Sequence, residues 1–215
     1  MKNMEKPVII FGAKGIGKSA LEIFQSNQVV VYGFLDEEKE IHNTEIGDVP
    51  ILGDPEDHGF LKLIGQKCEA FVANDDNALR RKQVNYLMKT RNVMPINAVH
   101  KEAYISKTAS IGHGNFIGAR AVLNSYAEIG QHCIINTAAV LEQEVKCGDL
   151  VQVGAGSILN SGVEVGEDAF IGSGVTVVSG IKIGKSARVG AGSLVVSDVP
   201  ENTTVFGNPA VRVEN

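Results

Sequence analysis

The sequence predicts an α/β N-terminal domain with a small parallel sheet, followed by an all-β solenoid. Three observations carry this prediction. An aliphatic residue or a Cys recurs at every sixth position from Ile105 to Val195, and the register never slips. Short apolar strands alternate with helical patterns before residue 98, and a glycine-rich turn follows the first strand. We therefore expect a first domain over residues 1–98 and a second over residues 99–215.

The first domain begins with an apolar run from Val8 to Phe11, which predicts a buried strand. A helical pattern follows from Ser19 to about Phe24, and residues 28–34 predict a second strand. The later segments are predicted as a loop with Pro50 (46–53), a helix (56–64), a strand (69–73), a turn (74–76), a helix (78–90) and a strand (93–96). This alternation is typical of a small parallel α/β domain.

The second domain consists of six-residue repeats. The second residue of a repeat is often Gly, and the fifth is usually small or β-branched. An α-helix, with its period of 3.6, does not keep every sixth residue on one face, and an ordinary strand with period 2 would need turns that break the six-residue count. The pattern predicts a solenoid in which each repeat is a short strand and a turn, with its first side chain in a narrow core. These first residues are Ile105, Ile111, Ile117, Leu123, Ile129, Ile135, Leu141, Cys147, Val153, Leu159, Val165, Ile171, Val177, Ile183, Val189 and Val195.

This repetitive passage resembles the hexapeptide-repeat family. The resemblance implies a left-handed parallel β-helix with about eighteen residues per coil. The hand is implied by the resemblance alone, because general crossover rules favour a right-handed connection. Members of the family are mostly acyltransferases, and the alternative is a β-helix that serves only as a scaffold.

The composition argues against several classes of protein. A net charge of −5 over 215 residues does not favour a surface for nucleic acid or for anionic membranes. The N-terminus has charged residues and then only a short apolar run, so it predicts neither a signal peptide nor a membrane-inserted helix. Three Cys do not form a disulfide framework, and Cys133 and Cys147 occupy inward repeat positions. These features favour a reducing cytoplasm.

The segment from Gly12 to Ser19 is the candidate binding site of the first domain. A strand, a glycine-rich turn and a helix form an anion site, because exposed N–H groups and the helix dipole attract negative charge. The same segment can be a tight turn that binds nothing. It also fits the P-loop pattern through Lys18 and Ser19, which would indicate an NTP-hydrolysing protein. The α/β segment is short for a P-loop domain with its switch elements, and the attached β-helix favours another activity.

The order of motifs along nearly the whole chain is more specific. The glycine loop is followed by Gly-Phe-Leu-Asp ending at Asp36, by Pro-Ile-Leu-Gly ending at Gly53, and then by the β-helix. This order resembles the bacterial sugar acetyltransferases of the bacillosamine and sialic-acid type. The resemblance implies a Rossmann-like N-terminal domain that binds a UDP-linked amino sugar for surface glycan synthesis.

The same resemblance assigns substrate-binding residues. The glycines of the loop would contact phosphate, and Asp36 would accept a hydrogen bond from the nucleoside. Lys14 belongs to the same set. The chain departs from the family at Ile16, where a His is frequent, and this weakens the assignment of a specific sugar. The glycines concerned are Gly12, Gly15 and Gly17.

The resemblance also implies a site for acetyl-CoA where two β-helices of a trimer meet. The family's catalytic signature matches the segment that contains Asn136, Glu142 and Glu144. The family's catalytic His is replaced by Gln143, and a second family His near the thioester is replaced by Gln152. Gln has no titratable nitrogen, so Gln143 cannot act as a general base.

The missing base leaves three interpretations open. A sugar amine is partly deprotonated near neutral pH, so N-acetylation could continue when both substrates are held together. Glu142 or Glu144 could replace the base if the cleft raises its pKa. Alternatively, the chain is a weak or inactive homologue that binds sugar nucleotides, or, more remotely, the P-loop protein considered above.

Acetyl-CoA is expected along the coils, with the turn at residues 207–210 close to it. The contacts assigned to it are Gln152, Gly154, Ala155 and Gly172, where small residues leave room for the pantetheine arm. The spacing of His, Cys and acidic residues suggests no metal site.

A homotrimer is expected for a second reason. Phe116, Phe170 and Val178 take outward repeat positions, where a monomer would leave them exposed. His113 and His132 also take outward positions and predict solvated imidazoles.

Overall fold

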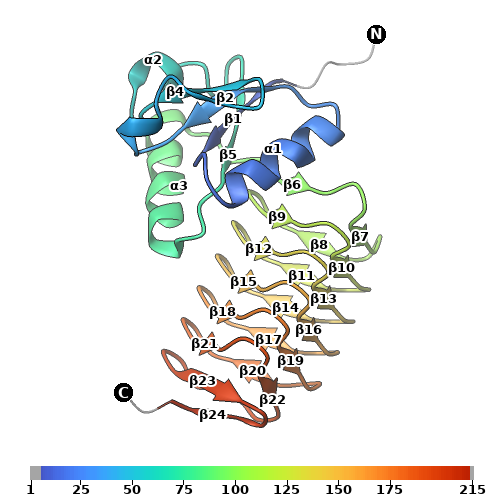
Figure 1. Cartoon of the computed structure of the whole chain (residues 1–215). Coiled ribbons are helices and arrows are strands. Elements are labelled where there is room, and N and C mark those ends of the chain that lie inside the picture. Colours follow the sequence, from blue (N-terminus) through green and yellow to red (C-terminus); the bar gives the residue numbers. More distant parts are fainter. Residues whose placement is uncertain (1–5, 214–215) are drawn as a thin grey trace. The chain divides into compact units, whose positions relative to one another are not determined.

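The structure, a computed structural model, describes residues 6–213. The chain separates into two compact units (Figure 1). Unit 1 ends at Lys101 and unit 2 begins at Glu102.

Unit 1 contains a five-stranded sheet in the order β3-β4-β2-β1-β5. Strands β1, β2, β4 and β5 are parallel, and the short edge strand β3 pairs antiparallel with β4. The strands are β1 (Val8–Phe11), β2 (Val31–Leu35), β3 (Glu45–Ile46), β4 (Val49–Gly53) and β5 (Glu69–Val72), and β6 (Ala98–Val99) comes last in the unit. The helices are α1 (Ile16–Ser26), α2 (His58–Leu61), α3 (Asn77–Arg91) and a 3-10 turn (Lys39–Ile41).

Helices α1 and α3 cover opposite faces of this sheet. Alternate residues of each strand point to opposite sides, so each strand contributes apolar side chains to both faces. On one side Ile9 and Phe11 belong to an apolar cluster with Leu87 of α3. On the other side Phe24 of α1 meets Phe71 of β5 edge to face, with ring centroids 5.7 Å apart. The parallel strands therefore all direct their carboxyl ends to one edge, where ligands bind in open α/β sheets.

The predicted elements of unit 1 need four corrections. Of the helix predicted over 56–64, only α2 (His58–Leu61) forms. Residues 46–53 form strands rather than a loop, because Pro50 lies near the start of β4, where a missing N–H costs little. Residues 93–96 form no strand, although the N–H of Ile96 donates to the carbonyl of Ala70 at 2.9 Å. Helix α1 begins at Ile16, three residues before the predicted start, because its uncapped N-terminus follows the glycine turn directly.

Unit 2 is a left-handed parallel β-helix with three sheets, here called face 1, face 2 and face 3. Face 1 contains β7 (Tyr104–Ile105), β10 (Val122–Leu123), β13 (Val140–Leu141), β16 (Ile158–Leu159), β19 (Thr176–Val177) and β22 (Leu194–Val195). Face 2 contains β8 (Ser110–Ile111), β11 (Glu128–Ile129), β14 (Lys146–Cys147), β17 (Glu164–Val165) and β20 (Lys182–Ile183). Face 3 contains β9 (Phe116–Ile117), β12 (Ile134–Ile135), β15 (Gln152–Val153), β18 (Phe170–Ile171) and β21 (Arg188–Val189), and ends in the hairpin of β23 (Thr204–Gly207) and β24 (Ala210–Arg212).

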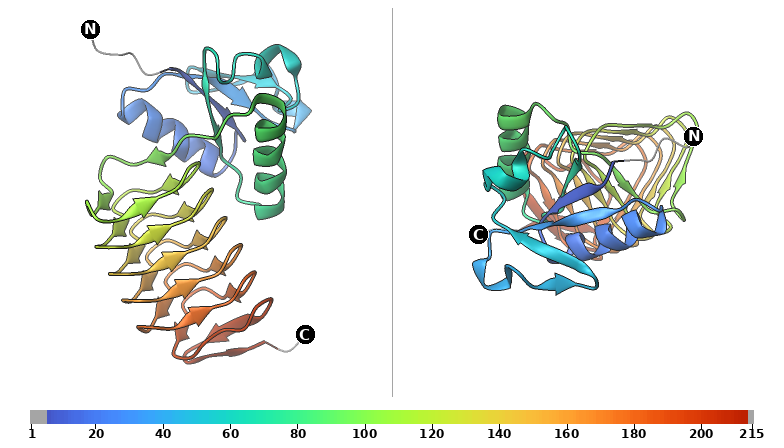
Figure 2. Two further views of the ribbon diagram at one scale, coloured as in Figure 1. Left: turned by 180° about the vertical axis from the view of Figure 1, so that it is seen from behind. Right: turned by 90° about the horizontal axis from the view of Figure 1, so that it is seen from above.

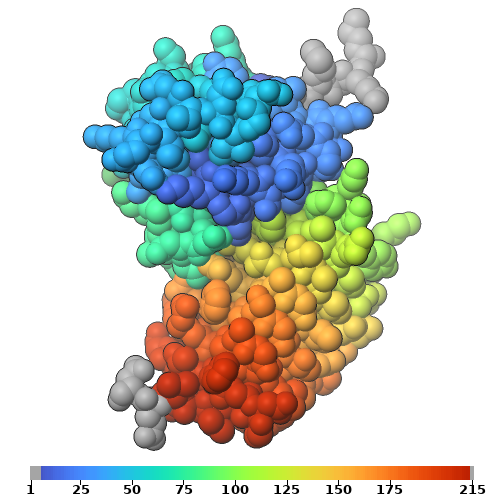
Figure 3. All heavy atoms as spheres, in the orientation of Figure 1, coloured from blue at the N-terminus to red at the C-terminus, as the bar shows by residue number. Residues whose placement is uncertain are grey.

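Each coil lies directly on the one before it (Figure 2) and the stack forms a continuous body (Figure 3, yellow to red). Strands pair in parallel with the strand one coil away, as Val122 does with Val140. The first residue of every repeat from Ile117 to Val195 is buried, which confirms the six-residue pattern. Cys133 and Cys147 are buried in this core as free thiols, and the apolar surroundings raise the pKa of the Cys147 thiol well above its usual value.

The outward residues of the β-helix differ from the prediction in two places. His132 is only 8% exposed, so it is not a solvated imidazole. Phe116 is 5% exposed, and the Arg188 guanidinium covers the ring of half-buried Phe170 at 4.7 Å. The outward apolar column lies on face 1 instead, where it consists of Tyr104, Val122, Val140, Ile158 and Leu194, all exposed or half-buried.

Candidate functional site

The glycine loop of unit 1 needs glycine for steric reasons. A Cβ on Gly17 would lie 2.0 Å from the carbonyl oxygen of Gly12, and one on Gly12 would lie 2.6 Å from that of Ala73. Gly15 has φ 44° and precedes the first residue of α1. Such contacts between backbone atoms leave no space for a side chain. The loop therefore brings bare backbone to the edge of the sheet.

The N-terminus of α1 opens into a pocket of about 210 Å³. Among residues 6–213 no side chain caps this helix. The first N–H groups of a helix have no partner within it, and its dipole is positive at that end. The pocket is lined by Gly12, Lys14, Gly15, Asp36, Ala73, Asn74 and Asp75. All but Gly17 of the predicted substrate-binding residues line this pocket, and its backbone suits a phosphate.

Asp36 directly follows β2, and its carboxylate connects the end of β2 to the glycine loop that follows β1. Its Oδ2 accepts the N–H of Ala13 at 2.7 Å, and its Oδ1 accepts the N–H of Glu38 at 2.9 Å. The ring Nε2 of His42 lies 2.7 Å from the backbone carbonyl of Asp36. Asp36 therefore positions the glycine loop. Each carboxylate oxygen can still accept a second hydrogen bond from a ligand.

Lys14 lies on the exposed tip of the loop, where its ammonium forms an ion pair with Glu38. The hydrogen bond to Glu38 is the main cause that raises the pKa of Lys14. Lys14 is therefore a cation at neutral pH. A phosphate in the pocket would compete with Glu38 for it.

Asp75 also lines the pocket. The sequence predicts only a turn at this position and no role in binding. A Cβ on Gly15 would lie 2.8 Å from Oδ2 of Asp75, so the carboxyl group closely faces the loop. Burial of that carboxyl group is the main cause that raises its pKa, and Arg80 opposes this shift. The signal in the sequence was the position of Asp75 just after β5, at the carboxyl edge of the sheet.

In unit 2 the predicted catalytic residues lie at two different corners. Gln143 and Glu144 are exposed at the corner between β13 and β14, and half-buried Glu142 precedes them. Asn136 lies at the corner between β12 and β13, where its Nδ2 donates to the carbonyl of Val153 at 3.2 Å. Within one chain, therefore, three of the four residues share a corner and Asn136 supports the coil.

Neighbouring coils hold the carboxamide and carboxylate at this corner. The hydroxyl of Ser161 donates to Oε1 of Gln143 at 2.7 Å, from one coil further along. Oε2 of Glu142 accepts from Nδ2 of Asn124 at 2.9 Å, from the coil before. Ser161 is 18 residues after Gln143, so the two residues take the same place in adjacent coils. With its oxygen held by Ser161, exposed Gln143 still has two amide N–H donors for a ligand.

The residues assigned to acetyl-CoA lie near the corner between faces 3 and 1. Gln152, Gly154 and Gly172 are buried, and Ala155 is exposed. A Cβ on Gly154 would lie 2.4 Å from the backbone nitrogen of Ser173, so this glycine is required by coil stacking. Ala155 alone of the four presents its side chain to solvent.

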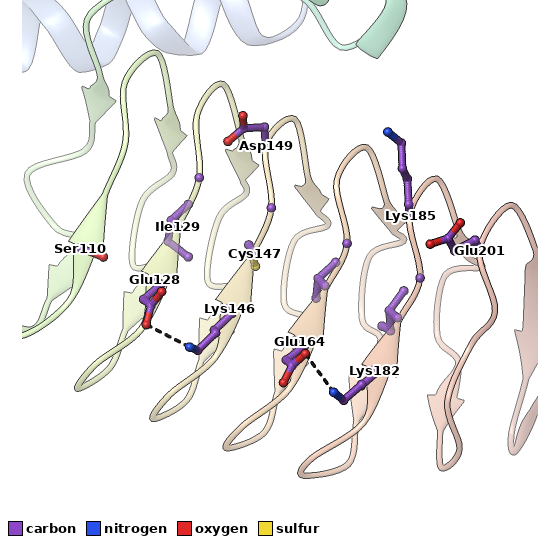
Figure 4. Close-up of a pocket in the computed structure, with 16 residues that line it drawn as sticks. Ser110, Glu128, Ile129, Lys146, Cys147, Asp149, Glu164, Lys182, Lys185 and Glu201 are labelled. Atoms are coloured by element: carbon purple, nitrogen blue, oxygen red, sulfur yellow. Dashed lines mark ion pairs between the residues drawn. The ribbon is translucent and has the colours of Figure 1, made fainter.

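Face 2 carries a separate hollow of about 640 Å³ (Figure 4). Glu128 pairs with Lys146, and Glu164 pairs with Lys182, each at 3.3 Å. None of the predicted site residues, all of which the structure describes, lines this hollow. Exposed ion pairs of this kind contribute about 0–1 kcal/mol each. We interpret the face as a solvated surface of the scaffold.

Among residues 6–213, no group of three or more His, Cys, Asp or Glu side chains is arranged to hold a metal ion. No helix in that range has the length and apolar character needed to cross a membrane.

Comparison with known proteins gives a consistent result. A sequence profile of the PglD N-terminal domain family matches residues 7–87. PerB from Caulobacter crescentus, in complex with CoA and GDP-perosamine, is 32% identical to the chain with a TM-score of 0.89, over 97% of both chains. A histidine-to-asparagine variant of perosamine N-acetyltransferase from the same organism, with the same two ligands, is also 32% identical over 97% of both chains, with a TM-score of 0.90.

A more distant structure has the same fold. The acetyltransferase domain of PglB from Neisseria gonorrhoeae, in complex with acetyl coenzyme A, is 24% identical with a TM-score of 0.88. The similarity covers 97% of the chain and 100% of that domain. No curated protein sequence matches the chain at a significant level.

Proposed function

Because this chain belongs to the hexapeptide-repeat sugar acetyltransferases, we propose that it transfers an acetyl group from acetyl-CoA to the amino group of a nucleotide-linked sugar. The observation that carries the proposal is the uncapped N-terminus of α1, which opens beside Asp36 into a pocket suited to a diphosphate. In the transfer, the amine nitrogen attacks the thioester carbonyl, the C–S bond breaks, and CoA leaves as the thiol after a proton moves from nitrogen to sulfur.

The pocket of unit 1 supplies nucleotide binding. Gly12 and Gly15 form the backbone surface of the phosphate site, Gly17 allows the close approach of the loop behind it, and Lys14 adds a cation. The resemblance in the sequence predicts UDP, whereas the nucleotide in the Caulobacter structures is GDP. Both share the diphosphate, so the glycine loop itself does not distinguish between them.

The corner with Gln143 supplies the position for the acceptor. Gln143 cannot take the proton of the amine, so the sugar must react as the free amine. Its N–H groups, oriented by Ser161, can hold a carbonyl or hydroxyl oxygen of a substrate. Glu142 and Glu144 remain alternatives for the base. In the Caulobacter enzyme a histidine-to-asparagine variant is seen with CoA and GDP-perosamine, so both ligands can occupy that variant.

A homotrimer is part of this proposal. Face 1 carries the outward apolar column, and it lies between the corner with Gln143 and the corner with Asn136 and Ala155. A second copy that covers this column would bring the two kinds of corner together from different chains. Acetyl-CoA would then lie against Ala155, near Gln152. Light scattering that shows a monomer at micromolar concentration would contradict the trimer.

A cytoplasmic location remains a prediction. It is supported by three free, buried thiols, which suit a reducing compartment.

The proposal is tested by release of the CoA thiol from acetyl-CoA in the presence of UDP- and GDP-linked amino sugars. We expect slow turnover that rises with pH as free amine replaces ammonium. Ala155→Phe should weaken CoA binding, and Ala155→Ser should not, because only the larger side chain fills the proposed groove. A bulky residue at Gly172 is not a suitable test, because its Cβ would lie 2.5 Å from the backbone nitrogen of Ala191.

Two other outcomes would each select a different interpretation. Binding of a nucleotide sugar without any acetyl transfer would identify an inactive homologue. Tight binding of ATP with magnesium, and of no sugar nucleotide, would favour the P-loop protein.

A further inference from the structure

A second pocket of unit 1 lies beside the phosphate site. It is lined by Phe11, Glu37, Glu56, Lys82, Gln83 and Tyr86, together with Pro55. Phe11 and Glu37 are the direct neighbours of Gly12 and Asp36, which line the phosphate pocket. The Cα atoms of consecutive residues are about 3.8 Å apart, so the linings of the two pockets are adjacent at the carboxyl ends of β1 and β2. A nucleoside diphosphate in the first pocket would therefore place its base near the second.

The floor of this second pocket has a buried acceptor. Gln83 on α3 is 6% exposed, and its Oε1 has no hydrogen-bond partner among the described residues. A buried polar atom without a partner is costly, so such an atom indicates a missing ligand or water. The enclosed space measures about 10 Å³, enough for one small group. The pocket can therefore receive the edge of a ring but not the ring itself.

The mouth of the pocket carries charges of both signs. Lys82 Nζ lies 3.8 Å from Oε1 of Glu37 and 3.9 Å from Oε1 of Glu56. All three side chains are about half exposed, so these ion pairs are weak and can rearrange around a ligand. From inside to outside, the pocket thus offers an amide oxygen, carboxylates and an ammonium.

We propose that this pocket is the nucleobase subsite and that it selects guanine. The exocyclic amine would donate to Oε1 of Gln83, the ring N1–H to one of the two carboxylates, and O6 would accept from Lys82. Half-buried Tyr86 supplies apolar surface for the ring, which stays at the mouth of the pocket. This inference rests on the proposed function, since it identifies the nucleotide of the same substrate.

The other bases fit this set of groups less well. Adenine and cytosine have an amine, but the adjacent ring nitrogen is an acceptor that a carboxylate would repel. Uracil has a ring N–H but no amine, so Oε1 of Gln83 would stay without a partner. Guanine alone of the four places an amine beside a ring N–H.

The test compares GDP with IDP, which differs only by lacking the exocyclic amine. By calorimetry, the wild-type protein should bind GDP about 10- to 100-fold more tightly than IDP, the usual effect of leaving a buried polar group unpaired. Gln83→Leu should weaken GDP to the affinity of IDP and leave IDP unchanged. UDP should bind more weakly than GDP.

The comparison in the wild-type protein needs no variant, so it remains decisive if Gln83→Leu fails to fold. Equal affinity for GDP and IDP would overturn the inference and indicate that a water molecule satisfies Gln83. Acetylation of a UDP-linked amino sugar, unaffected by Gln83→Leu, would overturn the guanine subsite and leave the acetyltransferase intact. Failure to bind any nucleotide or sugar nucleotide would overturn both.

Discussion

The two units use glycine for different purposes. In unit 1, Gly12 and Gly17 belong to a single loop. Because they lack side chains, the backbone of this loop can lie close to itself and to Ala73. In unit 2, Gly154 and its counterparts recur at the corners, where a Cβ would meet the backbone of the next coil. The first set brings backbone without side chains to the carboxyl edge of the sheet. The second set lets identical coils stack.

This difference also determines how side chains meet. In unit 1, residues distant in sequence converge because the parallel strands end at the same edge, as Asp36 and Ala13 do. In unit 2, the neighbour of a residue is the one at the same place in the next coil, as Ser161 is for Gln143. A site on the β-helix is therefore a column, and a change in one coil is felt mainly in the adjacent coils.

The largest effect is expected from breaking the stack. Gly154→Ala should lower the free energy of unfolding by about 3–5 kcal/mol, because its Cβ would lie 2.4 Å from a backbone nitrogen. Gly156→Ala is the matched control. Its φ of +66° is strained for alanine, at about 1–2 kcal/mol, yet a Cβ there meets nothing within 4 Å in the described part of the chain. Equal losses in denaturant unfolding would show that coil stacking does not require Gly154.

The next effect concerns the column at Gln143. Gln143→His should raise the rate of acetyl transfer by about 10- to 1,000-fold, because a general base typically contributes at least this much. Steady-state kinetics with a nucleotide-linked amino sugar measures the change. Glu144→Gln is the companion variant. If Gln143→His gains nothing while Glu144→Gln abolishes activity, a carboxylate has taken over as the base.

A smaller effect is expected from removing the carboxylate that holds the glycine loop. Asp36→Ala should weaken nucleotide binding by about 1–3 kcal/mol, because a charged acceptor of the loop is lost. Asp48→Ala removes the same charge from an exposed position of the same unit and should leave the affinity unchanged. Calorimetry with the preferred nucleoside diphosphate distinguishes them. Equal losses in both variants would assign the effect to net charge alone.

The smallest effect comes from Asp75. Its carboxylate faces the phosphate pocket, so Asp75→Asn should tighten diphosphate binding about fivefold, near the 1 kcal/mol of two charges about 4 Å apart in water. Because the pKa of Asp75 is raised, the carboxyl group is neutral below that pKa and charged above it. Affinity in the wild-type protein should thus fall as pH rises through that pKa. A pH titration in which Asp75→Asn behaves like wild type would exclude this repulsion.

Much of unit 2 could be predicted from the sequence. A side chain at every sixth position enters the core, and any slip of register would bury a polar residue in most coils. The loop in unit 1 was predicted because a strand, three glycines and a helix form a local motif. The strand β4 was not predicted, because Pro50 is a poor strand former. In the structure Pro50 lies near the start of β4, opposite the short edge strand β3, where a missing N–H is tolerated.

By itself, the sequence determined the coil, the glycine loop and the place of Gln143, because each depends on short-range spacing. Only the tertiary structure decided which outward column is exposed, that His132 is buried, and that Ser161 holds Gln143. It also placed the buried oxygen of Gln83 beside the phosphate site. The physical reason is that burial and hydrogen bonding depend on residues far away in sequence, and a helix such as α3 acquires its partners only when it packs on the sheet.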